Sequence, residues 1–310
     1  MAPSTAESSV LPKARDFKEN GGSPRVFLPF GIGAVLLLAL FGKVLFDLAV
    51  FAFKTDVYSH ILLIPFISGY LIWQQRGALP VPRRASALPA IVAAALGLLL
   101  LIVFFVLRFS GAQFSRADYL FFTVLPFCCF MLANTLYFLG SAFAKSILFP
   151  VGFFFFVAPF PDVVTNGLEI GSQHASAEVY SWFLNLTGAT YFQDGRVFIL
   201  PNMPPIEVAQ ECSGIRSSLV LFITSLIGGH MFLRSTWSKV FLALVVFPLG
   251  IFRNAFRIYT ITMLSVHWNP DVINGPLHSR GGPIFFLLSL IPFFIFLLWL
   301  RKADAKVGQL

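Results

Sequence analysis

The stretch LPAIVAAALGLLLLIVFFVL, residues 88–107, contains no charged side chain and decides the fold class. Lipid offers the backbone no hydrogen bonds, so about 20 apolar residues in a row cross a bilayer as an α-helix, which satisfies its own N–H and C=O groups. Arg84 lies shortly before this stretch and Arg108 directly follows it, as is common at the ends of a membrane span. We therefore predict a transmembrane helix here.

Seven further apolar stretches raise the number of predicted spans to eight. The eight are Val26–Leu48, Ile61–Trp73, Leu88–Leu107, Tyr119–Leu139, Ala142–Phe160, Gly214–Leu233, Val240–Thr260 and Ile284–Leu300. The composition agrees, because 57% of the 310 residues are hydrophobic and only 12% are charged. A soluble domain carries about 25% charged residues. The expected fold class is an all-α polytopic membrane protein with about eight transmembrane helices.

The basic residues indicate how the chain is oriented in the membrane. Of the 22 Lys and Arg residues, thirteen fall in segments that are cytoplasmic if the N-terminus is inside, and five fall in outer segments. This bias predicts that both termini are cytoplasmic. The net charge of +8 thus reflects topology, and we do not expect a nucleic-acid partner. Residues 1–25 are expected to be a disordered cytoplasmic tail without a cleavable signal peptide, and 26–310 a single transmembrane domain.

One long connection, at about 161–213, is predicted to lie outside the cytoplasm. Its first part, Val163–Leu186, has apolar residues at helical spacing but too many polar ones for a span, which predicts an amphipathic helix. Residues 191–199 follow with Asp194-Gly195 at their centre, a pair that favours a β-hairpin turn. The expected insertion is therefore one helix and one hairpin.

The chain has three cysteines, in two different settings. Cys128 and Cys129 lie in the middle of a span, where a free thiol behaves as a small apolar side chain. Cys212 lies at the predicted outer start of the sixth span, with Arg216 one turn further on. A helix N-terminus favours a thiolate, so Cys212 is a candidate nucleophile. The residues alone also allow it to be an ordinary small residue at a helix boundary.

Two more elements are predicted at the same outer level. Arg253, Asn254 and Arg257 lie in the seventh span, with the two arginines at i and i+4 on one face. Arginine inside a span is costly, so it usually faces the interior of the bundle and marks function. His278 lies in a loop rich in Gly and Pro, just before the last span.

These residues together suggest nucleophilic catalysis. His278 would accept the thiol proton of Cys212 and later protonate the leaving amine. Arg257 would stabilise the tetrahedral oxyanion. Arg216, Arg253 and Asn254 are candidates for substrate-binding or supporting roles. No group of His, Cys, Asp and Glu has metal-ligand spacing, and we expect neither a metal nor a cofactor.

At these residues the chain resembles the exosortase/archaeosortase family of polytopic membrane enzymes. The matching blocks are Cys212–Ser217, Asn254–Ile258 and His278–Gly282, and Tyr58–His60 and Glu207–Ala209 are also similar. The resemblance implies a thiol-dependent peptidase or transpeptidase with Cys212, Arg257 and His278 as the catalytic residues, and it selects Arg257 over Arg253. It also implies cleavage of C-terminal sorting signals of the PEP-CTERM kind on exported proteins, at the outer face of the bacterial inner membrane, with a link to exopolysaccharide export.

Two alternative functions come from other classes. A transporter would use intramembrane charges as a polar pathway, and Lys43 and Asp47 in the first span lie at i and i+4. Mutual neutralisation of these two side chains is the simpler interpretation. A scaffold for envelope or exopolysaccharide assembly would need none of the three catalytic side chains.

Overall fold

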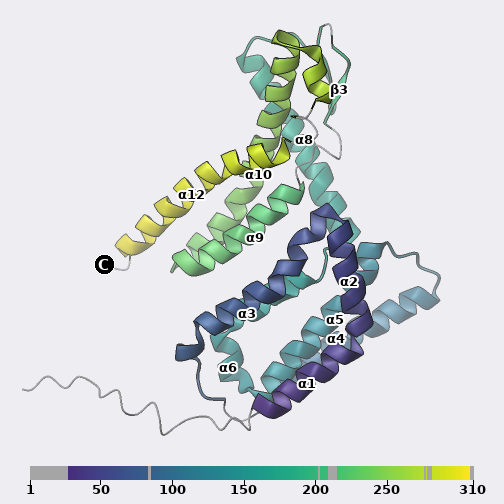
Figure 1. Cartoon of the computed structure of the whole chain (residues 1–310), viewed down its shortest axis with the longest axis vertical. Coiled ribbons are helices and arrows are strands. Elements are labelled where there is room, and N and C mark those ends of the chain that lie inside the picture. Colours follow the sequence, from purple (N-terminus) through teal and green to yellow (C-terminus); the bar gives the residue numbers. More distant parts are fainter. Residues whose placement is uncertain are drawn as a thin grey trace, which may run out of the picture. The chain divides into compact units, whose positions relative to one another are not determined.

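The computed structural model describes residues 27–82, 85–201, 203–208, 215–275, 277 and 281–307. These residues are mainly helical, with one small sheet. The chain divides into two compact units, and Figure 1 shows the elements of both. Unit 1 comprises residues 1–46, 64–113 and 122–157, and unit 2 comprises residues 47–63, 114–121 and 158–310.

The helices confirm the predicted fold class of an all-α polytopic membrane protein. Five described helical segments are long and apolar enough to cross a membrane, and two bent helix pairs raise this number to seven. A shorter apolar helix, α9, occupies the place of the predicted sixth span. The five long segments are Val57–Gln74 (η2, Asp56–Leu63, and α3, Ile64–Gln74), α4 (Ala87–Phe109), α5 (Arg116–Phe138), α10 (Thr236–His267) and α12 (Gly282–Val307).

Two predicted spans are broken rather than continuous. The first divides at Phe41 into α1 (Phe27–Leu40) and α2 (Gly42–Lys54). The fifth divides at Ile147 into α6 (Gly140–Ser146) and α7 (Leu148–Phe154), which continues into η4 (Phe155–Val157), with a bend of 78°. Pro150 lies in the first turn of α7, where its missing N–H costs no helical hydrogen bond, so the break falls just before it.

Unit 1 packs α1, α3, α5, α6 and α7 around a core at the bend of the fifth span. Leu139, Phe143 and Ile147 are buried there, with Phe30 and Ile72 packed against them. The side chain of Asn134 on α5 donates a 3.1 Å hydrogen bond to the carbonyl oxygen of Phe30 on α1. Cys128 and Cys129 are free and buried, as expected of small apolar side chains in a span.

Unit 2 contains a bundle of α9 (Ile215–Phe232), α10 and α12, which lie side by side in Figure 1. A buried apolar cluster draws on all three helices and the turn that follows α9. The core residues are Leu221, Leu233, Leu242, Val246, Phe293, Leu297 and Leu300. Helix α9 is joined to α10 by only three residues, 233–235. Such a short loop makes two consecutive helices antiparallel neighbours.

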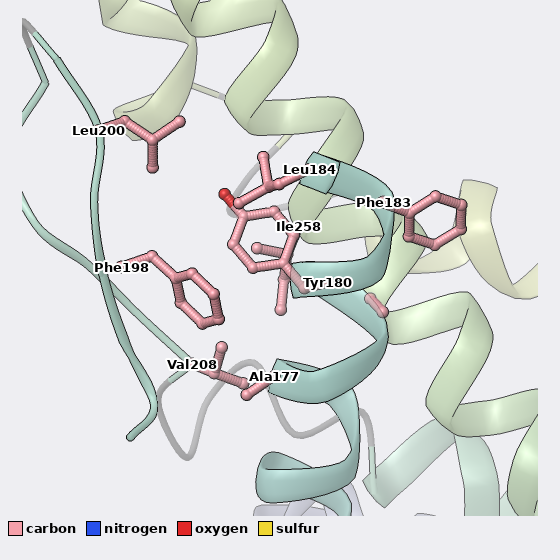
Figure 2. Packing of buried hydrophobic residues seen from close by; sticks show 9 residues of the cluster. Ala177, Tyr180, Phe183, Leu184, Phe198, Leu200, Val208 and Ile258 are labelled. Atoms are coloured by element: carbon pink, nitrogen blue, oxygen red, sulfur yellow. The ribbon is translucent and has the colours of Figure 1, made fainter. Parts of the chain in front are cut away.

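The long connection forms the predicted helix and hairpin. Helix α8 (Asp162–Leu186) is followed by β1 (Phe192–Asp194), β2 (Val197–Ile199) and β3 (Ile206–Glu207) in one antiparallel sheet. Gly195 has a φ of 59° in the turn between β1 and β2, a conformation that glycine adopts without strain. Figure 2 shows Phe198, Leu200 and Val208 facing the side chains of Ala177, Tyr180 and Leu184 on α8.

One expectation about the first span is wrong. The carboxylate of Asp47 pairs with the guanidinium of Arg116 on α5, at 3.2 Å, and within the described residues it forms no ion pair with Lys43. A lysine four residues away on the same helix is a neighbour in sequence, but Arg116 offers a planar, weakly hydrated guanidinium from another helix. The pair therefore fastens α2 to α5 within unit 2.

Candidate functional site

The described part of the candidate site is centred on α10. Arg253 is 7% exposed and Asn254 is 1% exposed, whereas Arg257 is partly exposed. Arg253 and Arg257 are four residues apart, so their Cα atoms are separated by about 6 Å along the helix axis. The burial of Arg253 agrees with the expectation that it faces the interior of the bundle, and for Arg257 this stays a prediction.

Asn254 is held by α8, which the sequence alone does not reveal. Its side-chain amide donates a 3.1 Å hydrogen bond to the hydroxyl of Ser176, which is fully buried. Tyr180, one turn further along α8, donates a 3.0 Å hydrogen bond to the hydroxyl of Thr262 on α10. Burial raises the pKa of Tyr180 to about 12, and the bond to Thr262 offsets part of this rise. Two buried polar contacts therefore fix α8 to the helix that carries the arginines.

The three-stranded sheet is also fastened to α8. The guanidinium of Arg196 donates a hydrogen bond to the side-chain oxygen of Gln173, which is 3% exposed. The backbone N–H of Val208 donates to the carbonyl oxygen of Arg196 at 2.9 Å. The side chain of Val208 is fully buried in the cluster that also contains Ala255 and Ile258 of α10. The chain is thus anchored up to Val208, four residues before Cys212.

Helix α9 begins three residues after Cys212 and packs closely on α10. A Cβ atom on Gly250 of α10 would lie 2.5 Å from the hydroxyl oxygen of Ser218 on α9. Near the other end of α9, a Cβ on Gly229 would lie 3.6–3.7 Å from atoms of Lys239 and Leu242. The helices are therefore antiparallel, with the first turns of α9 beside the middle of α10. Cys212 itself and the side chain of Arg216 lie outside the described residues.

His278 also lies outside the described residues, but Leu277 before it and Gly281 three residues after it are described. The backbone N–H of Gly281 donates a 3.0 Å hydrogen bond to the carbonyl oxygen of Leu277. A Cβ on Gly281 would lie 2.1 Å from that oxygen, so this turn requires glycine. Shortly after it, the ring of Phe285 on α12 lies 6.3 Å from the ring of Phe256 on α10, between centroids.

Tyr58–His60, a stretch that resembles the exosortase/archaeosortase family, lies in η2, which packs against α9. Tyr58 and His60 are 6% and 8% exposed. The hydroxyl of Tyr58 donates a 3.2 Å hydrogen bond to the carbonyl oxygen of Phe160. Both side chains are therefore part of the packed interior of unit 2. The sequence indicated neither the burial nor the partner.

A small cavity of about 260 Å³ is lined by residues of α10 and α12. Arg253 contributes to its lining, together with Phe252 and Phe256 of α10 and Phe285 and Ser289 of α12. The lining is almost entirely apolar, and Arg253 and Ser289 are the polar residues that contribute to it. In the described part of the chain no group of three His, Cys, Asp or Glu side chains could hold a metal ion.

A comparison with protein families gives one match. The sequence profile of the transmembrane exosortases matches residues 52–295, which is most of the chain and includes every candidate residue named above. No curated protein and no solved structure matches the chain. The family membership supports a membrane role of the transpeptidase type. On the matched region and the polytopic helical fold, this chain belongs to the transmembrane exosortase family.

Proposed function

We propose that this protein is a thiol-dependent membrane peptidase or transpeptidase in which Cys212, His278 and Arg257 are the catalytic residues. Its substrates would be exported proteins that carry a C-terminal sorting signal of the PEP-CTERM kind. Cleavage would occur at the outer face of the inner membrane, with both termini of the enzyme in the cytoplasm, and would be linked to exopolysaccharide export. The observation that carries the proposal is that two anchored segments, one before Cys212 and one after His278, pack against α10 on either side of Arg257, at Ile258 and at Phe256.

The first anchored segment supports a position for Cys212 near α10. Val208 shares a buried cluster with Ile258, the residue after Arg257. Four residues span at most about 14 Å when fully extended. On the other side of Cys212, α9 begins at Ile215 and is in close contact with α10 at Ser218 and Gly250. A link of this length allows the thiol to reach the arginine face, which supports its proposed role.

The second anchored segment supports the same position for His278. It is bracketed by Leu277 and Gly281, whose backbone groups are hydrogen-bonded to each other. Phe285 follows at one turn into α12 and contacts Phe256, the residue before Arg257. An imidazole carried by this turn would therefore lie near the level of Arg257.

The proposed reaction has two steps. The thiol of Cys212 loses its proton to His278, and its sulfur attacks the carbonyl carbon of the scissile peptide bond. The negative charge on the tetrahedral oxygen is stabilised by the guanidinium of Arg257, which acts near low-dielectric surroundings. The C–N bond then breaks, His278 returns the proton to the leaving amine, and a thioester remains. Water or an acceptor amine cleaves the thioester and restores the thiol.

The test follows the mass of an exported protein with a C-terminal membrane anchor, in membranes of a strain that expresses each variant equally. We expect the uncleaved form to accumulate with Cys212→Ala and not with wild type. Cys129→Ala is the matched control, because it also removes a thiol, but a buried one outside the proposed site. The substitution keeps the Cβ of Cys129, which lies close to Gly97. If the protein is a transporter or an assembly scaffold, the amount of uncleaved substrate should be the same with wild type, Cys212→Ala and Cys129→Ala. That result would overturn the proposal.

A further inference from the structure

A cavity of about 650 Å³ lies within unit 1, and Arg257, the proposed catalytic residue in the described part of the chain, does not line it. It is bounded by α1, α3, α5, the bent pair α6–α7 and the segment Leu79–Pro82. Binding pockets for small molecules commonly have volumes of roughly 300–1,000 Å³. The cavity is therefore large enough to hold a ligand of substantial size.

The lining indicates what kind of ligand would fit. It is mostly aliphatic and aromatic, with Ile72, Met131, Leu132, Val151 and Phe154 among its members. An apolar cavity is not filled by water, which needs two to four polar partners, but takes up hydrocarbon. The interior of the cavity thus suits an acyl chain.

Few polar groups interrupt this lining. The hydroxyl of Thr135 is already bonded to the carbonyl oxygen of Met131, at 2.9 Å. Ser68 is 4% exposed, and its hydroxyl has no hydrogen-bond partner among the described residues. A change of rotamer would let this hydroxyl donate to an ester carbonyl in the cavity. The polar content is therefore compatible with a lipid ester and with little else.

The mouth of the cavity carries a cation. Arg76 is exposed, lines the cavity, and has its guanidinium carbon 4.7 Å from the centre of the Trp73 ring. Trp73 is also exposed and lies at the end of the span Val57–Gln74. Tryptophan at the end of a span is typical of the boundary between lipid and water. A cation at this boundary suits a phosphate group whose hydrocarbon lies deeper.

We propose that this cavity binds one anionic phospholipid, with an acyl chain between α3, α5 and α7 and the phosphate at Arg76. A site of this kind explains why a membrane protein keeps a large apolar space beside a bent helix pair. It is independent of the proposed cleavage reaction, and its test needs no substrate.

The acyl-chain part is tested by filling the cavity. Gly69 lines it, and a Cβ there would meet no atom within 4 Å, so Gly69→Phe should occupy the space. Gly31→Phe on α1 is the matched control, because that glycine is equally open and does not line the cavity. We expect native mass spectrometry of the purified full chain to show one retained phospholipid on wild type and Gly31→Phe, and none on Gly69→Phe. Equal retention on all three would overturn the proposal.

The phosphate part is tested by exchange with vesicles of phosphatidylglycerol or phosphatidylcholine. We expect wild type to prefer phosphatidylglycerol, and Arg76→Gln to lower that preference about fivefold, as loss of one basic residue at an anionic surface implies. Arg301→Gln is the control, since Arg301 is also exposed and lies over an aromatic ring, that of Phe232, in unit 2. Arg76 is exposed, so its loss should leave folding intact. An unchanged preference with Arg76→Gln would overturn the assignment of the headgroup.

Discussion

The side-chain amide of Asn254 donates a 3.1 Å hydrogen bond to the hydroxyl of Ser176, and both residues are almost completely inaccessible. This bond joins α8, which belongs to the long connection, to α10, which carries Arg257 three residues further on. A buried polar group is costly unless it is paired, so the two helices are specified as partners rather than only packed together.

Ser176→Ala should destabilise the fold, because it leaves the N–H group of Asn254 without its acceptor. A buried donor without an acceptor costs about 1–3 kcal/mol. Replacing both residues, with Asn254→Leu and Ser176→Ala together, should cost less than the sum of the two single changes. Thermal unfolding of the purified protein measures this. Thr260→Ala is the control, since that hydroxyl is bonded to the carbonyl of Phe256 on its own helix. Strict additivity would contradict the coupling.

The sequence predicts the helices well and their contacts poorly. Apolar runs indicate most of the spans because a bilayer demands about 20 such residues, and the residues around Asp194-Gly195 indicate the hairpin. The break at Phe41 follows no proline, and the partner of Asp47 is Arg116 rather than Lys43. Both depend on which helices meet, and apolar periodicity does not encode that.

The candidate site follows the same division. Arg253, Asn254 and Arg257 could be named as candidates because polar side chains are costly in a span, and their role in the reaction stays a prediction. Ser176 and Tyr180 could not be identified as the residues of α8 that bond to α10, since small and aromatic residues are common on any amphipathic helix. Cys212 and His278 remain predictions, because both lie outside the described residues.

Tyr180 gives a prediction about alkaline pH. Its folded-state pKa of about 12 lies above the ordinary value of 10. The folded protein therefore holds this proton more tightly than the unfolded chain does. The contribution of Tyr180 to the free energy of unfolding is complete below pH 10 and is lost as the pH rises from 10 to 12. A shift of this size corresponds to roughly 2–3 kcal/mol. Tyr180→Phe keeps the ring against Phe198, at 4.7 Å, but cannot ionise.

We therefore expect the melting temperature of wild type to fall more than that of Tyr180→Phe between pH 10 and pH 12. All other side chains are the same in the two proteins, so their effects cancel in the difference. Parallel curves for the two proteins would show that the hydroxyl of Tyr180 is not buried against Thr262.

Gly250 and Ser218 give a compensation test of the contact between α9 and α10. Gly250→Ala should destabilise the bundle, because its Cβ would lie 2.5 Å from the hydroxyl oxygen of Ser218. Adding Ser218→Ala removes that oxygen and leaves a Cβ contact of 3.4 Å, so the double variant should regain most of the loss. Gly228→Ala is the control, as its nearest neighbour is 3.8 Å away on Leu297. Unfolding temperatures decide, and no recovery would mean that the helices approach elsewhere.

Gly281 and Gly282 form a natural pair for testing the turn that carries His278. A Cβ on Gly281 would overlap the carbonyl oxygen of Leu277, whereas a Cβ on Gly282 would meet no atom within 4 Å. We expect Gly281→Ala to slow substrate processing strongly and Gly282→Ala to leave it near wild type. Processing is measured by the mass of the exported substrate. Equal rates for the two variants would show that the geometry of this turn does not matter for the reaction.

Arg257 and Arg253 should separate catalysis from structure. Arg257 is partly exposed on α10, so Arg257→Ala should leave the melting temperature close to that of wild type. Loss of one group that stabilises an oxyanion lowers the rate about 10²–10³-fold, and we expect this loss in processing. Arg253 is 7% exposed and lines the cavity between α10 and α12. Arg253→Ala should therefore lower the melting temperature, unlike Arg257→Ala.

The comparison is sharpest with lysine substitutions, which keep the charge but not the planar guanidinium. Arg257→Lys should process substrate faster than Arg257→Ala if a positive charge beside the oxyanion is what matters. The kinetics require single-turnover measurements with equal amounts of folded enzyme, because a destabilised variant would otherwise mimic a slow one. If Arg257→Ala processes substrate at the wild-type rate and Arg253→Ala does not, the catalytic arginine is Arg253, one turn deeper in the helix.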